Sequence, residues 1–369
     1  MIYLDNGATS LRKPPAVALA MRSALYRCAN PGRGGHAAAM EAAKTVYRCR
    51  KRAGELFECA PEQVVFTSNC THGLNIAIRS LVKPGDRVLI SGFEHNAVTR
   101  TLHGLGAEIK VAGRTLFDWA DTLTEWEAGL RSGVQAAVFT HVSNVFGYIL
   151  PVHAMARLCR EYRVPFVVDA AQSAGTLPVS LAKLEADYIA MPGHKGLLGP
   201  QGTGLLLCKS RPEPLIFGGT GSESMEQAMP DFLPDRCEAG TLNVPGIAGL
   251  SAGMAWLQKQ GIGNVHRREH DQLMRCIQGL GEMGIRCFAG SHQTATVSLQ
   301  PELDCEEMAD KLGKLDIAVR AGLHCAPLAH ASAGTLGTGT VRVSFGIDAC
   351  AEQTDAFLNA MNKILTGRK

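Results

Sequence analysis

Short apolar runs alternate with segments of helical periodicity over the first 210 residues. The runs predicted as strands are continuous rather than alternating, at 63–67, 87–91, 107–111, 136–140, 165–168 and 205–208. Between them apolar residues recur at helical spacing, as at Val152, Met155, Ala156 and Cys159. Continuous apolar strands separated by helices are typical of a parallel sheet covered on both faces. This part of the chain is therefore predicted to be an α/β domain.

The pattern changes after about residue 246. Helices are predicted to dominate up to about residue 283, and strands then follow at 294–299, 317–320 and 341–345. Earlier in the chain, the polar stretch 112–131 is predicted to be irregular and 217–229 to be a loop. With 369 residues, two domains are expected. We predict a large domain at 16–246 and a smaller α+β domain formed by 1–15 and 247–369.

Composition and charge exclude several classes of function. Hydrophobic residues make up 46% and charged residues 19%, which is typical of a folded soluble protein. The net charge of +3 is spread along the chain, so no nucleic-acid partner is expected. No segment resembles a signal peptide or a membrane helix of ~18 apolar residues, which predicts a cytoplasmic protein without a membrane partner.

The twelve cysteines contain no Cys-x-x-Cys pair, so no zinc or other metal site is expected. Most of them are predicted to be buried free thiols, as is usual in a reducing cytosol.

Polar residues stand where several predicted strands end. They are the segment 67–71, Glu94 with His95, Asn144, Asp169 and Lys195. In parallel α/β sheets, ligands bind at the carboxyl ends of the strands. Lys195 lies in a turn, Gly193-His194-Lys195-Gly196, whose glycines allow the backbone to approach a bound group. The turn could hold a lysine that forms a Schiff base, or it could be a glycine-rich loop with a surface lysine.

These residues match the requirements of pyridoxal phosphate. Lys195 could bind its aldehyde, Asp169 could pair with its pyridine nitrogen, and His95 could stack on its ring. Thr71 and His194, with backbone N–H groups at a helix start, could hold its phosphate. Each has a plainer alternative, because the carboxylate and the histidine could be structural and the polar segment could simply cap a helix.

The glycine-rich loop 30–36 carries Arg33 and His36, which could reach a substrate. A surface loop with incidental charges is the alternative.

Several segments resemble the class V aminotransferase family of fold-type I pyridoxal phosphate enzymes. They occur in the family's order along the whole chain, at 3–9, 94–95, 168–172, 193–195 and 238–241. The segment 320–327, Arg-Ala-Gly-Leu-His-Cys-Ala-Pro, is similar to the active-cysteine segment of cysteine desulfurases, closest to the selenocysteine lyase-like group. The resemblance implies a large domain with a mainly parallel sheet and a smaller α+β domain that carries Cys325 and Arg342.

The resemblance also implies the contacts of the cofactor. Lys195 would be the Schiff-base lysine and would move protons, with Asp169 on the pyridine nitrogen and His95 stacked on the ring. Gln172 would pair with the phenolate oxygen and Asn144 would lie beside it. The remaining cofactor contacts would come from Thr71, His194 and, from the neighbouring subunit of a homodimer with shared active sites, Thr241.

Three residues depart from the family pattern. Pro192 stands where a Ser or Thr hydroxyl is common, and proline offers the phosphate no donor. Cys70 and His72 stand where Thr and an acidic residue are common. Cys70 is nevertheless expected to contact the cofactor.

The reaction implied by the resemblance is cysteine desulfuration. Arg342 would bind the carboxylate of L-cysteine, and the Cys325 thiolate would take its sulfur as a persulfide while alanine is released. His324 could tune that thiol or be structural. Selenocysteine could be a further substrate, and a sulfur-acceptor protein a further partner.

Two alternatives remain open. One is another class V enzyme (a C–S lyase, an epimerase or an aminotransferase) in which Cys325 is not catalytic, and Cys325 itself could be one more buried cysteine among twelve. The other is a sulfur-trafficking or scaffold protein without turnover.

Overall fold

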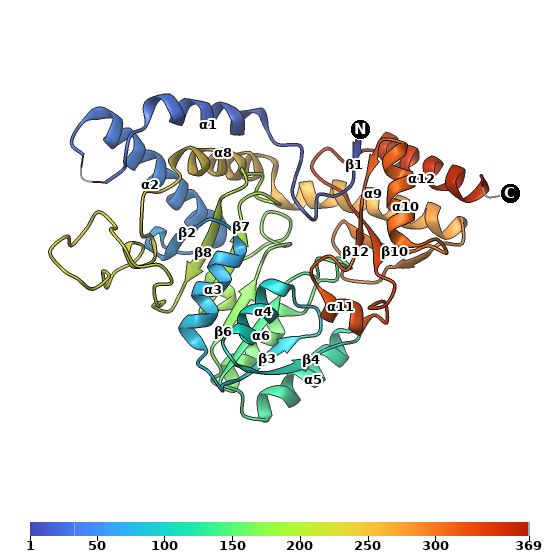
Figure 1. The fold of residues 1–369 in the computed structure, drawn as a ribbon, viewed down its shortest axis with the longest axis horizontal. Coiled ribbons are helices and arrows are strands. Elements are labelled where there is room, and N and C mark those ends of the chain that lie inside the picture. The colour runs from blue at the N-terminus through green and yellow to red at the C-terminus, as the bar shows by residue number, and fades with distance from the viewer. Residues whose placement is uncertain (33, 368–369) are drawn as a thin grey trace.

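A seven-stranded sheet forms the centre of the computed structural model, which describes residues 1–32 and 34–367 (Figure 1). Its strand order is β2 (Val64–Thr67), β8 (Gly204–Cys208), β7 (Tyr188–Pro192), β6 (Phe166–Asp169), β5 (Ala136–Thr140), β3 (Arg87–Ser91) and β4 (Glu108–Ala112). All neighbouring pairs are parallel except those of β8, which runs antiparallel to both β2 and β7. The predicted, mainly parallel sheet is confirmed.

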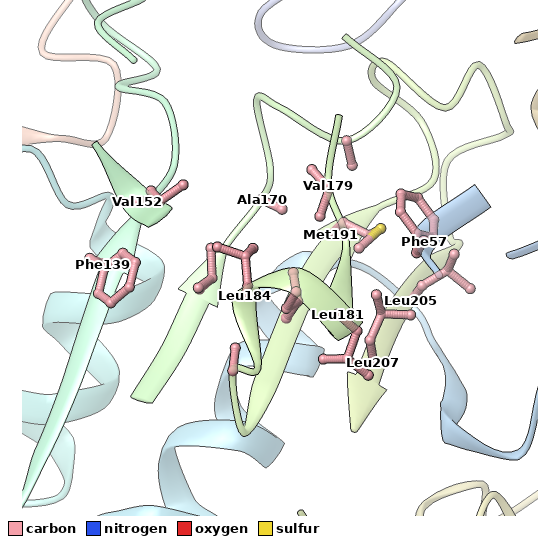
Figure 2. Packing of buried hydrophobic residues seen from close by; sticks show 14 of the residues in the cluster. Phe57, Phe139, Val152, Ala170, Val179, Leu181, Leu184, Met191, Leu205 and Leu207 are labelled. Atoms are coloured by element: carbon pink, nitrogen blue, oxygen red, sulfur yellow. The ribbon is translucent and has the colours of Figure 1, made fainter. Parts of the chain in front are cut away.

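Apolar side chains are buried on both faces of this sheet. Along β5, Ala137 and Phe139 belong to one apolar cluster, and Ala136 and Val138 belong to another on the opposite face. Figure 2 shows part of the first cluster, in which Phe139 and strand residues such as Leu205 lie among helix residues. The continuous apolar strands of the sequence are explained by this two-sided burial.

Helices cover both faces of the sheet. The helices of this part of the chain are α1 (Pro15–Arg27), α2 (Ala37–Phe57), α3 (Cys70–Leu81), α4 (Asn96–Gly104), α5 (Trp119–Arg131), α6 (Val152–Glu161), α7 (Leu181–Leu184) and α8 (Val244–Gln260). α8 packs against α1 and α2. The predicted domain boundary at residue 246 falls within α8, and the division into 16–246 and the remainder stays a prediction.

A smaller antiparallel sheet lies at the other end of the molecule. Its order is β12 (Arg320–Gly322), β13 (Thr340–Ser344), β10 (Thr296–Gln300) and β9 (Arg286–Phe288), with α9 (Ile262–Glu282), α10 (Cys305–Lys314) and α12 (Ala351–Thr366) beside it. β1 (Ile2–Tyr3) pairs with β11 (Ile317–Ala318), so the N-terminal strand joins this unit. The first strand, β1, and the last helix, α12, both lie at this end in Figure 1.

The prediction that 112–131 is irregular is wrong from residue 119 onward, where α5 begins. The side chain of Asp118 caps this helix by accepting a hydrogen bond from the Asp121 N–H at 2.9 Å. Thr122, Trp126 and Leu130 form its buried face. Their spacing of four residues was the available signal, but Thr122 is polar and interrupts the apolar stripe. Within the residues described, no helix is long and apolar enough to cross a membrane.

Candidate active site

Lys195 projects from the loop that follows β7. The Leu198 N–H closes a turn on the Lys195 carbonyl at 2.9 Å, and the Gly199 N–H donates to the Gly193 carbonyl at 2.7 Å. Gly175, with φ +88°, packs on this loop so closely that a Cβ there would lie 2.3 Å from the Gly196 oxygen. The loop is therefore fixed by close backbone packing on both sides.

The Lys195 side chain lines a cavity of about 110 Å³ at the carboxyl ends of the parallel strands. Burial lowers the pKa of its amine, and the Arg342 guanidinium lowers it further. A lowered pKa leaves more of the amine uncharged and nucleophilic. The other predicted site residues that line this cavity are Cys70, Thr71, His95, Asn144, Asp169, Gln172 and His194.

Asp169 ends β6 and is buried. Its Oδ1 accepts hydrogen bonds from the Ala171 N–H at 2.8 Å and from the Cys70 thiol at 3.4 Å. Both bonds go to one oxygen, so Oδ2 is available to a group in the cavity. Burial and the Asp169 charge raise the pKa of Cys70 well above its ordinary value, so this thiol stays a hydrogen-bond donor.

His95 is the N-cap residue of α4. Its Nδ1 accepts a hydrogen bond from the Ala97 N–H at 3.0 Å, which assigns the proton of the neutral ring to Nε2. Burial lowers the pKa of His95, which favours that neutral ring. Behind it the buried carboxyl of Glu94 accepts a hydrogen bond from the Thr140 N–H at 2.8 Å. Burial raises the pKa of Glu94 to about 8.

The N-terminus of α3 borders the same cavity. Asn69 caps it by accepting a hydrogen bond from the His72 N–H at 2.9 Å, and Thr71 lies in the first turn. His194, on the facing loop, lies 3.0 Å from Thr9 Oγ1 through its Nδ1, and burial lowers its pKa to about 4. A helix N-terminus beside polar side chains suits an anion.

Arg342 on β13 faces the N-terminal segment. Its Nη2 donates to Asp5 Oδ1 at 2.7 Å and its Nη1 donates to the Asn144 carbonyl at 3.0 Å. Ser344 lies on the same face, as predicted, and its Oγ accepts a hydrogen bond from the Gly7 N–H at 2.8 Å. Eight buried side-chain atoms have no hydrogen-bond partner among the described residues, and two of them are Arg342 Nε and Asn144 Oδ1. A buried polar atom without a partner is one that a polar ligand could satisfy.

Asp5 and Arg320 are two site residues that sequence reasoning missed. Arg320 binds Asp5 Oδ2 with Nη2 at 2.8 Å and with Nε at 3.0 Å, so Asp5 joins Arg320 to Arg342. The only indication of this site in the sequence was an acidic residue directly after the apolar start of the chain. The arginines lie more than 300 positions from Asp5, and no local pattern predicts such a pairing.

Cys325 lies in the turn after β12 and is the one exposed cysteine of the twelve. It is therefore not a buried structural cysteine. The Asn96 N–H donates to the Cys325 carbonyl at 2.7 Å, and Asn144 Nδ2 donates to the His324 carbonyl at 2.8 Å. The turn is thus attached to residues beside His95 and within the Lys195 cavity.

The other predicted residues lie in different surroundings. Gln172 does line the Lys195 cavity, but its side chain donates to the Gly7 carbonyl at 2.9 Å. His36 caps α2 by accepting a hydrogen bond from the Ala39 N–H at 3.3 Å. Thr241 lines a separate cavity of about 400 Å³ together with 30–32 and 219–221. Arg33 lies outside the described residues. No cluster of metal-binding side chains is found in 1–32 and 34–367.

The family model described as Aminotransferase class-V matches residues 2–357 of this chain. A probable cysteine desulfurase from Pyrococcus abyssi is 31% identical over 99% of this chain and 94% of its own length. A probable cysteine desulfurase from Aeropyrum pernix is 31% identical over 100% of this chain and 95% of its own length. The apo structure of a cysteine desulfurase from Thermococcus onnurineus NA1 has a TM-score of 0.91 and 31% identity over 99% of this chain and 95% of its own.

A second solved structure, the cysteine desulfurase CsdA from Escherichia coli, has a TM-score of 0.84. It is 26% identical over 99% of this chain and 94% of its own. The similarity therefore covers both sheets and the predicted fold class is confirmed.

Proposed function

Since the chain belongs to the class V aminotransferase family, we propose that it is a pyridoxal-phosphate-dependent cysteine desulfurase. It converts L-cysteine to L-alanine and takes the sulfur onto Cys325 as a persulfide. One observation carries the proposal. The single exposed cysteine is bonded through its backbone to Asn96, next to His95, in a turn that also binds Asn144 of the Lys195 cavity.

The residues of the cavity fit pyridoxal phosphate. Lys195 offers an amine of lowered pKa, and Asp169 has a free oxygen for the pyridine nitrogen. His95 offers a flat neutral ring, and the N-terminus of α3 with Thr71 offers donors to the phosphate. Asn144 has an unused acceptor. When bound, the cofactor would act as an electron sink for bonds at the substrate α-carbon.

Arg342 would bind the substrate carboxylate. Its Nε is buried without a partner, while the other two nitrogens are fixed on Asp5 and Asn144. A guanidinium held in this way presents an N–H in a fixed direction, which suits a planar carboxylate. The Asp5 carboxylate hydrogen-bonds to both Arg342 and Arg320 and offsets one of their two positive charges, so the Arg342 guanidinium is held in place before substrate binds.

Lys195 and Cys325 would share the chemical work. The Lys195 amine would take the proton from the substrate α-carbon, for which its lowered pKa is suited. The Cys325 thiolate would attack the substrate sulfur, forming an S–S bond as the carbon–sulfur bond breaks. The electron pair of the broken bond stays on the three-carbon fragment, which takes up a proton and leaves as alanine.

A second copy of the chain would complete the site. Thr241 is exposed beside residues 30–32 in a cavity apart from Lys195, which supports the proposal that it reaches the cofactor phosphate of a partner subunit. Arg33 and His36, which follow residues 30–32 in the sequence, are proposed to reach the partner's substrate. An exposed catalytic thiol also favours a reducing compartment such as the cytoplasm, where a sulfur-acceptor protein could collect the persulfide.

Product analysis tests the proposal. The purified protein, loaded with cofactor, is incubated with L-cysteine or selenocysteine and dithiothreitol. Equal amounts of alanine and sulfide, or of alanine and selenide, are expected. Pyruvate and ammonia in place of alanine would identify a C–S lyase instead. Loss of optical activity in the recovered amino acid would identify an epimerase, and the absence of any turnover would favour the non-enzymatic alternative.

A further inference from the structure

Three buried side chains form a hydrogen-bonded chain that ends beside Cys325. His324 lies 3.2 Å from the Arg320 carbonyl through Nε2 and 3.4 Å from His330 Nε2 through Nδ1. His330 in turn lies 2.7 Å from Thr335 Oγ1 through its Nδ1. All three residues are less than a tenth exposed, and none of them binds substrate or cofactor in the function proposed above.

The Arg320 carbonyl, at one end of this hydrogen-bonded series, determines which ring nitrogens carry protons. The Arg320 carbonyl can only accept, so His324 Nε2 carries a proton and its Nδ1 is an acceptor in the neutral ring. His330 Nε2 must then donate, which leaves His330 Nδ1 to accept from the Thr335 hydroxyl. Burial lowers the pKa of His324 to about 3 and of His330 to about 4, so both rings are neutral at physiological pH.

The backbone at the end of this chain has an unusual conformation. His324 and Cys325 both adopt left-handed φ angles, 50° and 55°, which non-glycine residues rarely adopt. Such a turn persists only where its surroundings hold it. Its two carbonyls accept hydrogen bonds from Asn144, in the segment after β5, and from Asn96, at the start of α4. The His324 ring holds the opposite side, because it bonds back to the carbonyl four residues earlier.

We propose that His330 and Thr335 are positioning residues for Cys325. Thr335 orients His330, His330 donates to Nδ1 of the His324 ring and fixes its direction, and that ring holds the turn in which Cys325 presents its thiol. Without the Thr335 hydroxyl, His330 loses the partner that holds its ring in this direction. His324 then has no fixed partner at Nδ1, so its bond to Arg320 weakens and the turn relaxes. The inference rests on the proposed function, since it assigns a role in presenting the nucleophile.

A pair of substitutions at Thr335 tests this. Thr335→Val removes the hydroxyl at nearly constant shape, whereas Thr335→Ser keeps it. With the cofactor-loaded enzyme, we expect T335V to lower kcat for alanine formation about tenfold, with KM for cysteine within twofold of the parent. T335S is expected to stay within twofold in both. Cofactor absorbance per chain should be unchanged in both variants.

A second measurement does not depend on turnover. The rate at which iodoacetamide alkylates Cys325, identified by peptide mass, should change at least threefold in T335V and not in T335S. A merely structural role would lower the melting temperature of T335V. It would leave kcat and the alkylation rate of Cys325, each per folded chain, unchanged, and this result would overturn the inference. Should the parent form no alanine, the proposed function would fail, and the alkylation rates would still decide the positioning role.

Substitution of His330 provides a route if T335V does not fold. His330→Gln can keep a donor near the position of Nε2, whereas His330→Phe keeps only a ring against Phe146. The alkylation rate is expected to stay closer to that of the parent in H330Q than in H330F. Equal rates in both variants and the parent would again overturn the inference.

Discussion

Replacing Arg342 by lysine should weaken substrate binding without loss of the cofactor. Arg342 uses Nη1 and Nη2 on Asn144 and Asp5 and has only Nε left without a partner. Lysine keeps the positive charge next to Asp5. It lacks the planar fork with which Arg342 reaches both Asp5 and the Asn144 carbonyl while its Nε–H stays available to the substrate. A hydrogen bond to a charged group contributes about 1.5–3 kcal/mol. The expected rise in KM for L-cysteine is therefore roughly 10- to 150-fold.

The assay is steady-state alanine formation, with cofactor content measured by absorbance on the same samples. Arg275→Lys is the matched control, because Arg275 makes a two-pronged ion pair with Asp355 at 2.7 and 2.8 Å on an exposed surface. Exposed pairs contribute little, so its KM should be unchanged. A folded R342K enzyme whose KM lies within twofold of the parent would refute the assignment of Arg342 to the substrate carboxylate.

Two further predictions concern stability and one concerns cofactor binding. Burial raises the pKa of Glu269 to about 8, so the stability gained from its bound proton is complete below about pH 4.5 and is lost as the pH rises from there through 8. Glu269→Gln should therefore stabilise the protein at pH 8–9, by up to roughly 5 kcal/mol, but not at pH 4–5; melting curves with the same pH slope as the parent would contradict this. Gly175→Ala should prevent cofactor binding, since its Cβ would meet the backbone of the loop that carries Lys195. Gly284→Ala is the control, because Gly284 also has a positive φ but faces open space; this variant should bind the cofactor normally in an absorbance titration. Glu238→Gln should lower the free energy of unfolding in urea by about 3–5 kcal/mol, because the buried Arg50 guanidinium loses the charge of its partner; a loss below 1 kcal/mol would argue against a buried ion pair.

The positions of most site residues follow from local sequence patterns. Asp169 and Lys195 end apolar strands, and the ends of parallel strands meet at one edge of a sheet, so the shared cavity was predictable. The prediction that Arg342 and Ser344 share a face of β13 is confirmed, because side chains alternate along a strand.

Contacts between distant segments could not be predicted in the same way. The Cys70 thiol on Asp169 joins residues 99 positions apart, and the Asp5–Arg342 pair spans 337 positions. Such pairs depend on how segments distant in the sequence are brought together by the fold, and no period in the sequence encodes that arrangement. Helix α5 was missed for a different reason, since one of its three buried residues, Thr122, is polar and interrupts the apolar stripe.

The identity of the sulfur-accepting group is tested most directly by replacing Cys325 with alanine. After incubation with L-cysteine and without reductant, the parent enzyme should gain 32 Da, one sulfur atom, on the peptide that contains Cys325. Cys325→Ala should bind the cofactor with unchanged absorbance, form no alanine and gain no sulfur. Cys287→Ala, at a half-buried thiol in the smaller sheet, should behave as the parent. Alanine formation by C325A at the parental rate would contradict the account.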